Sequence, residues 1–462
     1  MEIGQILVGI IVLVLVAAAI YLWKALPIIS GYGAKILCSG VFVCGRKPED
    51  IIKNELRFFP IRLGRYSVDI NDQSATGSVF GLAKKKAVYR KGLGATLLNG
   101  IDEEEFRKQE FNLPVAPSIC QDAIEWPIGN RLKNTIAPTV NQQQLNCVLD
   151  QVFDDPKSAK NGTRAVIVLY NGEIVAERYA AGFSKDSRLA GWSMAKSVTS
   201  ALIGILVKQN KLNINAAALV EEWQNDERKN ITIGNLLHMS SGQRWWEYYA
   251  APSDATHMLY DEQSMSSFAK SKPFKYKPET IFNYSSGSTN ILSSIIRNAV
   301  GDRDYYRFPY EQLFYKIGML NTLMEVDTRG TFASSSYCFS TARDWARFGL
   351  LYLNDGVWNG ERILPEGWVK FTTTATPAKS TPNEGKYGAH WWLNEGKSTD
   401  PSTRKYPHVP EDCFRCQGYE GQYIWVIPSR KLVIVRLALE KGNCLDPDVF
   451  LPALINAFPA NA

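Results

Sequence analysis

Histidine is scarce in this sequence, which limits the chemistry that the chain can perform. Its 462 residues include four histidines, at positions 238, 257, 390 and 408. They form neither an H-E-x-x-H motif nor another close pair. The lone C-x-x-C of Cys413 and Cys416 has no second pair of ligands at zinc-site spacing. We therefore expect no metal centre and no cofactor.

A strong excess of one charge is also absent. Lysine and arginine total 52 against 46 aspartates and glutamates, a formal net charge of +6. Nucleic-acid-binding domains usually carry a concentrated basic surface, so we predict no nucleic-acid partner. The densest basic stretch, Lys84 to Lys91, is interpreted as a solvated face rather than as a contact with an anionic membrane.

Charge is missing altogether from one long run near the amino terminus. Residues 6–23 (ILVGIIVLVLVAAAIYLW) are 18 uncharged, mostly apolar residues, and such a helix approaches the thickness of the bilayer hydrocarbon. The alternative, a secretory signal peptide, would have a basic start and a shorter apolar run. Here the one charged side chain before the run is the acidic Glu2. We predict an uncleaved membrane anchor over residues 1–24.

The sequence gives opposing indications of the side of the membrane on which the rest of the chain lies. Lys24 and Lys35 follow the span, which favours a cytosolic chain, but long domains translocate largely regardless of flanking charge. We expect an extracytoplasmic, periplasmic catalytic domain. The eight cysteines of the chain would permit disulfides there without specifying any pairing.

The rest of the chain is predicted to form a membrane-proximal extension, residues 25–135, and one catalytic domain, residues 136–462. Two hairpins bound that domain: residues 165–180, with Asn171-Gly172 typical of a type I′ turn, and residues 422–437. Residues 210–375 are expected to be mostly helical, and a last helix covers 447–458. Strands at both ends with helices between them predict an α+β fold with one antiparallel sheet and a helical insertion.

Ser193 and Lys196 are the first candidate catalytic residues. They lie three positions apart at the expected start of a helix, within GWSMAKSVTSALIGI, so they share a helical face. A serine hydroxyl is a weak nucleophile until a base takes its proton. A lysine can be that base where burial favours its neutral form, and Lys196 has apolar neighbours.

A second nucleophile motif overlaps the first. Gly191 to Ala195 nearly matches G-x-S-x-G, and an α/β-hydrolase would add His390 or His408 to Ser193. That alternative needs a strand before the serine and parallel strand–helix alternation. Neither is visible in the sequence. We interpret His238 and His390 as structural, because a serine–lysine site does not need a histidine.

Two downstream segments could complete a serine–lysine site. FNYSSGSTN (282–290) places Tyr284 in a polar loop, where a tyrosine hydroxyl can carry a proton to a leaving group. CFRCQGYEGQYIWVIP (413–428) has glycines at 418 and 421 that would let a strand edge approach a substrate closely.

Together these elements resemble the serine β-lactamase and penicillin-binding protein superfamily, class C-type. Ser193-Met194-Ala195-Lys196 matches its S-x-x-K, Tyr284-Ser285-Ser286 stands where Y-x-N is expected, and Cys416-Gln417-Gly418 stands where K/H-T-G is expected. The order of motifs over residues 160–440 is most similar to the esterase and 6-aminohexanoate-dimer hydrolase branch, including LLHMSSGQRWWEYY, ARDWARFGLL and YGAHWW.

The resemblance implies a β-lactamase/transpeptidase-like fold and a role for each matched position. Ser193 would be the acylated nucleophile, Lys196 its base and Tyr284 the proton relay. Ser286 would bind Lys196 or the substrate, and the backbone amides of Ser193 and Tyr419, beside Gly418, would form the oxyanion hole.

This sequence also departs from the family pattern. Cys416-Gln417-Gly418 offers no cation for a substrate carboxylate, and Arg415 would point to the other side of its strand. We therefore expect hydrolysis of ester or linear amide bonds in a small-molecule or short peptide-like substrate, with Trp246, Glu247 and Tyr249 as candidate pocket residues. The alternatives are β-lactamase or D,D-peptidase activity, or a non-catalytic binding relative.

Overall fold

The computed structural model describes residues 3–133, 139–153, 162–218, 220–378, 386–396, 400–442 and 444–459. The chain divides into two compact units. The first unit comprises Met1–Gln109, Trp245–Ala269 and Glu325–Thr331, and the second comprises Glu110–Arg244, Lys270–Met324 and Phe332–Ala462. The boundaries expected after residues 24 and 135 stay predictions.

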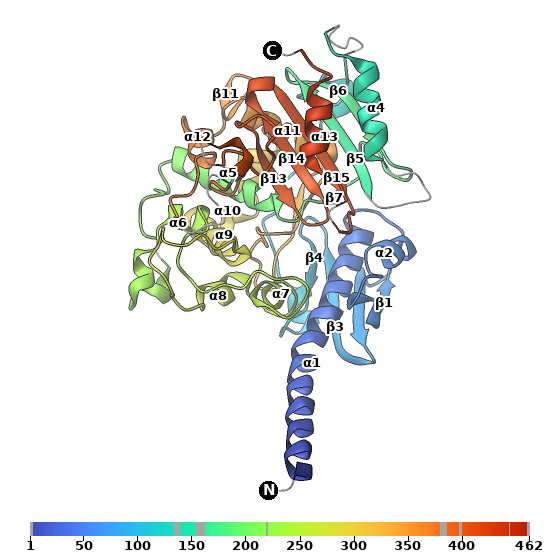
Figure 1. Ribbon diagram of the computed structural model, residues 1–462, viewed down its shortest axis with the longest axis vertical. Helices are drawn as coiled ribbons and strands as arrows, with labels where there is room; N and C mark the ends of the chain where they lie inside the picture. Colours follow the sequence, from blue (N-terminus) through green and yellow to red (C-terminus); the bar gives the residue numbers. More distant parts are fainter. Residues whose placement is uncertain are drawn as a thin grey trace. The chain divides into compact units, whose positions relative to one another are not determined.

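The first unit is built on one long helix and a four-stranded antiparallel sheet (Figure 1). Helix α1 runs from Ile3 to Phe42, exposed over residues 5–24 and mostly buried beyond them. The strands follow in sequence order: β1 (Gly64–Asp69), β2 (Ser74–Val79), β3 (Leu82–Arg90) and β4 (Gly94–Leu97). Its short helices are α2 (Pro48–Asn54), α3 (Glu103–Arg107), α7 (Asp254–Tyr260) and α8 (Met265–Lys270).

Small residues let α1 lie close against this sheet. A methyl group on Gly77 of β2 would lie 2.3 Å from the Ser30 carbonyl oxygen. A buried ion pair joins the same helix to the segment 325–331, because Lys35 binds the Glu325 carboxylate. The Ser39 hydroxyl at 2.9 Å and the Ala95 amide at 2.8 Å donate to that carboxylate as well. The second half of α1 is therefore part of a folded core.

The second unit contains a six-stranded antiparallel sheet in the order β12-β13-β14-β15-β5-β6. Its strands are β5 (Thr163–Tyr170), β6 (Glu173–Tyr179), β12 (Trp392–Leu393), β13 (Phe414–Gly418), β14 (Gln422–Ile427) and β15 (Leu432–Ala438). Pairing of β15 with β5 joins the two ends of the domain, which confirms the predicted sheet. Asn171 and Gly172, with φ of 52° and 82°, form the predicted hairpin turn.

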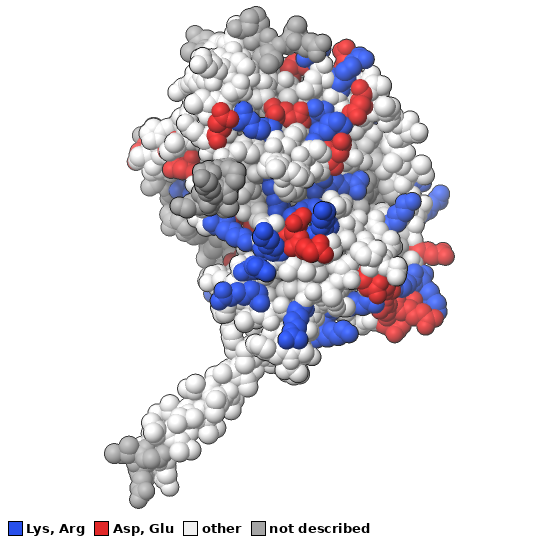
Figure 2. Space-filling model, turned by 90° about the vertical axis from the view of Figure 1, so that its right-hand side faces the viewer, with Lys and Arg blue, Asp and Glu red and all other residues white. Residues whose placement is uncertain are grey.

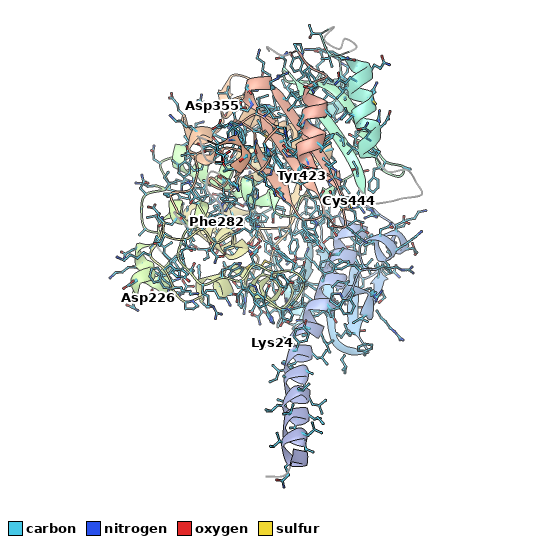
Figure 3. The ribbon with its side chains drawn as sticks, viewed as in Figure 1. Lys24, Asp226, Phe282, Asp355, Tyr423 and Cys444 are labelled. Carbon is cyan, nitrogen blue, oxygen red and sulfur yellow. The ribbon has the colours of Figure 1, made fainter. Side chains whose placement is uncertain are left out.

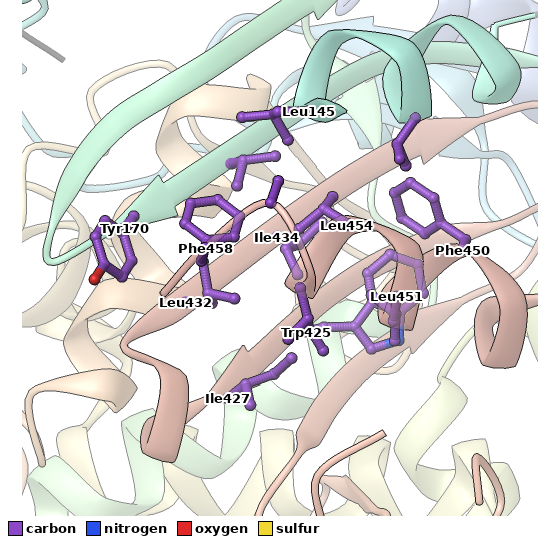
Figure 4. Close-up of a cluster of buried hydrophobic side chains, with 14 of the residues drawn as sticks. Leu145, Tyr170, Trp425, Ile427, Leu432, Ile434, Phe450, Leu451, Leu454 and Phe458 are labelled. Atoms are coloured by element: carbon purple, nitrogen blue, oxygen red, sulfur yellow. The ribbon is translucent and has the colours of Figure 1, made fainter. Parts of the chain in front are cut away.

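Helices cover both faces of this sheet. Helices α4 (Gln142–Val152) and α13 (Pro447–Ile455) lie on one face, over a core that includes Trp425 and Ile434 (Figure 4). Helix α11 (Ala342–Leu353) lies on the other face, where a methyl group on Gly349 would meet Val433. Because both faces are buried, β5 and β15 are apolar at nearly every position instead of alternating.

The middle of the chain is less helical than predicted. It holds α6 (Ile233–Leu237), α9 (Ser286–Val300), α10 (Asp302–Tyr305) and α12 (Trp368–Thr372), the short π-helix η5 (Tyr310–Phe314), and the strands β8 (Leu323–Met324), β9 (Cys338–Ser340), β10 (Val357–Trp358) and β11 (Glu361–Arg362). Residues 238–252 form loops, with positive φ at Met239 and Gly242 and a proline at 252. Such backbone positions end a helix, which is why the apolar pattern overstated the helical content.

Candidate active site

The candidate nucleophile lies where a strained turn enters a buried helix. Trp192 has φ of 48°, in the left-handed region that residues other than glycine seldom occupy. Ser193 then takes the cap position of α5 (Met194–Lys208), with φ of −63° and ψ of −7°. Ahead of the turn, β7 (Leu189–Ala190) pairs with β9. This turn presents the Ser193 side chain at the start of the helix.

The Lys196 side chain is almost wholly buried beside that serine. Its Nζ lies 2.9 Å from Ser193 Oγ, 3.0 Å from Ser286 Oγ and 2.9 Å from the Ser335 carbonyl oxygen, and the residue is 1% exposed. None of these three oxygens carries a formal charge. The Ser335 carbonyl can only accept a hydrogen bond, so a neutral amine that donates to Ser335 and Ser286 keeps its lone pair directed at Ser193.

Tyr284 and Ser286 reach the site from the start of α9. Ser285 caps this helix by accepting a hydrogen bond from the Ser288 amide at 3.0 Å, which places Ser286 in the first turn with its hydroxyl at Lys196. Lys196 Nζ lies 5.0 Å from the centroid of the Tyr284 ring. The structure thus brings together Ser193, Lys196, Tyr284 and Ser286.

Aromatic side chains hold the Tyr284 ring in this position. Trp392 stacks on it with centroids 5.3 Å apart, and Tyr387 meets it edge-on at 5.9 Å. Tyr387 also meets the Trp392 ring edge-on, with centroids 4.8 Å apart. The three rings restrict the directions in which the Tyr284 hydroxyl can point.

The end of β13 lies against the turn that precedes the nucleophile. A methyl group on Gly418 would lie 2.2 Å from the Gly191 carbonyl oxygen, and the rings of Tyr419 and Trp192 meet edge-on at 5.7 Å. The segments that carry the Ser193 and Tyr419 amides are therefore in contact. Gly418 is required by this approach of two backbone segments, whereas Gly421 serves a turn with φ of 82°.

Arg415 does not replace the cation that the third motif lacks. It pairs across the sheet with Trp425, on the face covered by α4 and α13, and its guanidinium lies 4.8 Å from the Tyr406 ring. The next residue, Cys416, points to the opposite face of the strand from Arg415, and β13 lies against α5. At 2% exposure, Arg415 is closed to a substrate. Cys413 and Cys416 are both free thiols, consistent with a regular strand.

The histidines do not form a triad with Ser193. His390 Nδ1 lies 2.7 Å from the Leu237 carbonyl, to which it donates, and its Nε2 then accepts from Thr289 Oγ1 at 2.9 Å. Burial lowers the pKa of His390 to about 3. His408 is exposed and bonds Asp448 at 2.6 Å. Among the described residues, no group of three or more His, Cys, Asp or Glu could hold a metal ion.

The aromatic pocket candidates belong to the first unit, so their role in a substrate site stays a prediction. Trp246 is exposed and stacks on Tyr248 with centroids 5.8 Å apart. The Glu247 carboxylate accepts hydrogen bonds from Tyr249 Oη and Trp245 Nε1, both at 2.5 Å. This carboxylate is therefore held by its own neighbours.

Sequence reasoning missed three contributors to the site: the Ser335 carbonyl, the strained Trp192 backbone and the Trp392 ring. Ser335 and Trp392 lie more than 130 residues from Lys196 along the chain. Ser335 belongs to no motif with Ser193. Trp392 ends the YGAHWW segment, but that resemblance gave it no role, so only folding could reveal these two contacts. A positive φ at a tryptophan likewise has no signature in local composition.

This fold and this site define a class, the β-lactamase/transpeptidase-like serine hydrolases. The family model described as Beta-lactamase matches residues 150–444, well over half of the chain. The chain belongs to the Beta-lactamase family and is a serine hydrolase.

Known proteins of two activities are similar to the chain. The 6-aminohexanoate-dimer hydrolase of Paenarthrobacter ureafaciens is 25% identical over 309 residues, which are 62% of this chain and 74% of that protein. A Bacillus anthracis structure provisionally named a 6-aminohexanoate-dimer hydrolase matches with a TM-score of 0.54 at 23% identity, covering 71% and 86% of the two chains. The structure of a family VIII carboxylesterase matches with a TM-score of 0.53 at 15% identity, covering 71% of this chain and 99% of that chain. The two structural matches show the fold alone.

Proposed function

We propose that this protein hydrolyses ester or linear amide bonds through an acyl-enzyme on Ser193. The observation that carries the proposal is the buried Lys196 amine, whose Nζ lies 2.9 Å from Ser193 Oγ among neutral oxygens. Burial disfavours the charged form of an amine, and a neutral amine can take the proton of a serine hydroxyl.

The proposed reaction has two halves. Ser193 Oγ forms a bond to the substrate carbonyl carbon while its proton passes to Lys196 Nζ. The amides of Ser193 and Tyr419 stabilise the charge that develops on the carbonyl oxygen. The bond to the alcohol or amine then breaks, and the leaving group receives a proton from Lys196 through the Tyr284 hydroxyl. Water attacks the acyl-enzyme by the reverse path, which releases the acid and restores Ser193.

The proposed substrate class follows from the third motif. A β-lactam or a D-Ala-D-Ala terminus carries a carboxylate, which the usual third motif of the superfamily would bind through its lysine or histidine. Cys416 and Gln417 supply none, and Arg415 is buried against Tyr406 on the opposite face of the sheet. This arrangement supports esters and linear amides over β-lactams. The similarity to the 6-aminohexanoate-dimer hydrolase supports the same choice.

A fluorophosphonate probe tests the nucleophile. We expect the wild type to be labelled and Ser193→Ala to lose the label. Ser197→Ala is the matched control, because Ser197 lies one turn along the same helix and donates to the His390 carbonyl; it should keep the label. Equal labelling of wild type and Ser193→Ala would refute the proposal.

A substrate panel tests the class: p-nitrophenyl esters, aminohexanoate dimer, nitrocefin and a D-Ala-D-Ala peptide. We expect turnover of the first two. Nitrocefin turnover that dominated the panel would favour a β-lactamase, and binding without turnover of any substrate would favour a non-catalytic relative.

A further inference from the structure

The first unit joins an exposed apolar helix to a folded sheet without a linker. Helix α1 is continuous from Ile3 to Phe42, and its residues 5–24 are exposed. At 1.5 Å per residue this stretch is about 30 Å long, the thickness of a bilayer hydrocarbon core. Lys24, labelled in Figure 3, lies where the helix leaves the rest of its unit. Because the helix is continuous, the residues of the folded sheet near Lys24 lie at a fixed distance, along the helix axis, from the apolar stretch.

The contacts of α1 identify which end of the sheet is near Lys24. Phe42, at the far end of the helix, stacks on Tyr89 near the end of β3, with centroids 5.6 Å apart. Ser30, closer to Lys24, meets Gly77 near the end of β2. Continuing along α1 toward its amino terminus leads to the turn between β2 and β3, at Phe80 and Gly81.

Large apolar side chains are exposed at this end of the sheet. Phe80 is 75% exposed and Leu82 is 61% exposed. Phe59 and Leu63 are exposed as well, and Leu63 directly precedes Gly64, the partner of Val79 in the sheet. Phenylalanine and leucine side chains form the apolar faces of segments that lie in the membrane interface, and tryptophan, such as Trp23 of α1, is enriched there.

Unpaired positive charge accompanies these apolar side chains. Lys24, Arg62, Arg65 and Lys84 are exposed, and none of them forms an ion pair with another described residue. The sequence holds no aspartate or glutamate in residues 57–68 or 73–101. Figure 2 shows Lys and Arg side chains gathered next to the protruding part of α1.

The opposite end of the sheet differs in charge. Asp69 and Asp72 flank the turn between β1 and β2, and Asp72 pairs with Lys86 and Arg107. The basic stretch noted in the sequence is thus divided: Lys86 is bound at the acidic end, Lys85 pairs with Asp261, and Lys84 remains exposed. Lys91, in the turn after β3, is exposed and forms no ion pair with a described residue either, but it lies at the end that carries Asp69 and Asp72. The end where the apolar helix emerges holds its cations without an acidic residue in 57–68 or 73–84.

We propose that this end of the first unit, which we call the docking end, binds the anionic headgroup region of the membrane that α1 enters. It consists of Phe59, Leu63, Phe80 and Leu82 with Lys24, Arg62, Arg65 and Lys84. The apolar side chains enter the interface and the cations bind lipid phosphates. The proposal rests on insertion of α1, not on the proposed reaction.

Spin labels in the full-length protein test the docking end. Phe80→Cys carries the nitroxide, in a background with Cys44, Cys120, Cys147 and Cys444 replaced by serine. Ile70→Cys is the matched control, because Ile70 is 60% exposed in the turn at the opposite end of the same sheet. The protein is reconstituted into phosphatidylcholine vesicles with and without phosphatidylglycerol, and collision rates with oxygen and with an aqueous nickel chelate are compared.

We expect the label at position 80 to collide preferentially with oxygen, which concentrates in lipid, and the label at position 70 with nickel. Phosphatidylglycerol should increase the depth in the bilayer of the label at position 80 and leave the label at position 70 unchanged. The double substitution Arg62→Glu and Lys84→Glu should abolish that increase. Equal nickel access at both positions would overturn the proposal. Dipolar broadening at position 80 that vanishes on dilution with unlabelled protein would overturn it in favour of a contact between two copies.

A third label, at Leu15→Cys, reports on the premise. Leu15 lies within the exposed apolar stretch of α1, and we expect its label to be the deepest of the three. Nickel access at Leu15 would overturn the proposal by removing the anchor, whereas the fluorophosphonate result on Ser193 would be unchanged. The two proposals therefore fail independently.

Discussion

A methyl group at position 418 provides the sharpest test of how β13 serves the reaction. In Gly418→Ala the new Cβ would lie 2.2 Å from the Gly191 carbonyl oxygen, where 3.4 Å is an ordinary contact. Neither the new Cβ nor the Gly191 carbonyl oxygen can rotate away, because both are fixed to the backbone. β13 and the turn before Ser193 must therefore separate by about 1 Å. A misplacement of that size can cost about 100-fold in rate, and loss of one oxyanion donor costs about 100- to 1,000-fold.

We therefore expect Gly418→Ala to lower kcat/KM for an ester substrate by about 100-fold or more. Overpacking should also lower the free energy of unfolding, by about 1 to 3 kcal/mol. Activity is measured with a p-nitrophenyl ester and by the rate of fluorophosphonate labelling, and stability by thermal unfolding of the same preparation.

Gly349→Ala separates the two effects. Its Cβ would lie 2.5 Å from Val433 Cγ1 and 2.8 Å from Ile424 Cγ2, so it overpacks the interface between α11 and the sheet without touching the Gly191 turn. We expect a similar loss of stability, with kcat/KM within about threefold of wild type. The reasoning would be refuted if Gly418→Ala kept wild-type kcat/KM, or if the two variants lost activity in proportion to their loss of stability.

Three further predictions concern other parts of the molecule. Trp392→Leu removes the ring stacked on Tyr284 and should lower kcat about tenfold with KM little changed, as steady-state kinetics would show; an unchanged kcat would contradict a positioning role. Burial lowers the pKa of His238 to about 4, against about 6.5 in an unfolded chain. Between these values the unfolded state binds more protons, so stability should fall as pH drops below 6.5, by about 1.4 kcal/mol per pH unit, and urea unfolding of His238→Phe should show a shallower pH dependence. Lys35→Met leaves the Glu325 carboxylate buried without its cation and should cost about 3 to 5 kcal/mol, part of which Glu325→Gln in the same chain should restore; thermal unfolding in a double-mutant cycle would measure both.

Much of the fold was predictable because it is encoded locally. The I′ turn at Asn171-Gly172 follows from two residues that tolerate positive φ, and the continuous apolar runs around it follow from burial on both faces of a sheet. The helical content of residues 210–375 was overestimated, since loops such as 238–252 bury apolar side chains without helical hydrogen bonds. An apolar pattern reports burial, and only indirectly the backbone conformation.

The types of catalytic residue in the candidate site were predictable from the sequence, but most of the distances between them were not. Ser193 and Lys196 share a helix turn, so their proximity follows from spacing. Tyr284 and Tyr419 were placed by resemblance, and their distances to the nucleophile depend on helices and strands that meet through tertiary packing. The pocket candidates Trp246 and Glu247 belong to the other compact unit and stay a prediction.

The sequence by itself determined the apolar stretch of α1, the two hairpins that pair to form the sheet, and a serine with a lysine one turn away. Each of these depends on residues within about one helix or hairpin. The tertiary structure alone decided that Lys196 is buried among three neutral oxygens, that Arg415 faces away from α5, and that Arg62, Arg65 and Lys84 are exposed without an ion pair to another described residue. Burial, strand facing and surface charge depend on segments far apart in the chain, and only the packed structure brings those segments together.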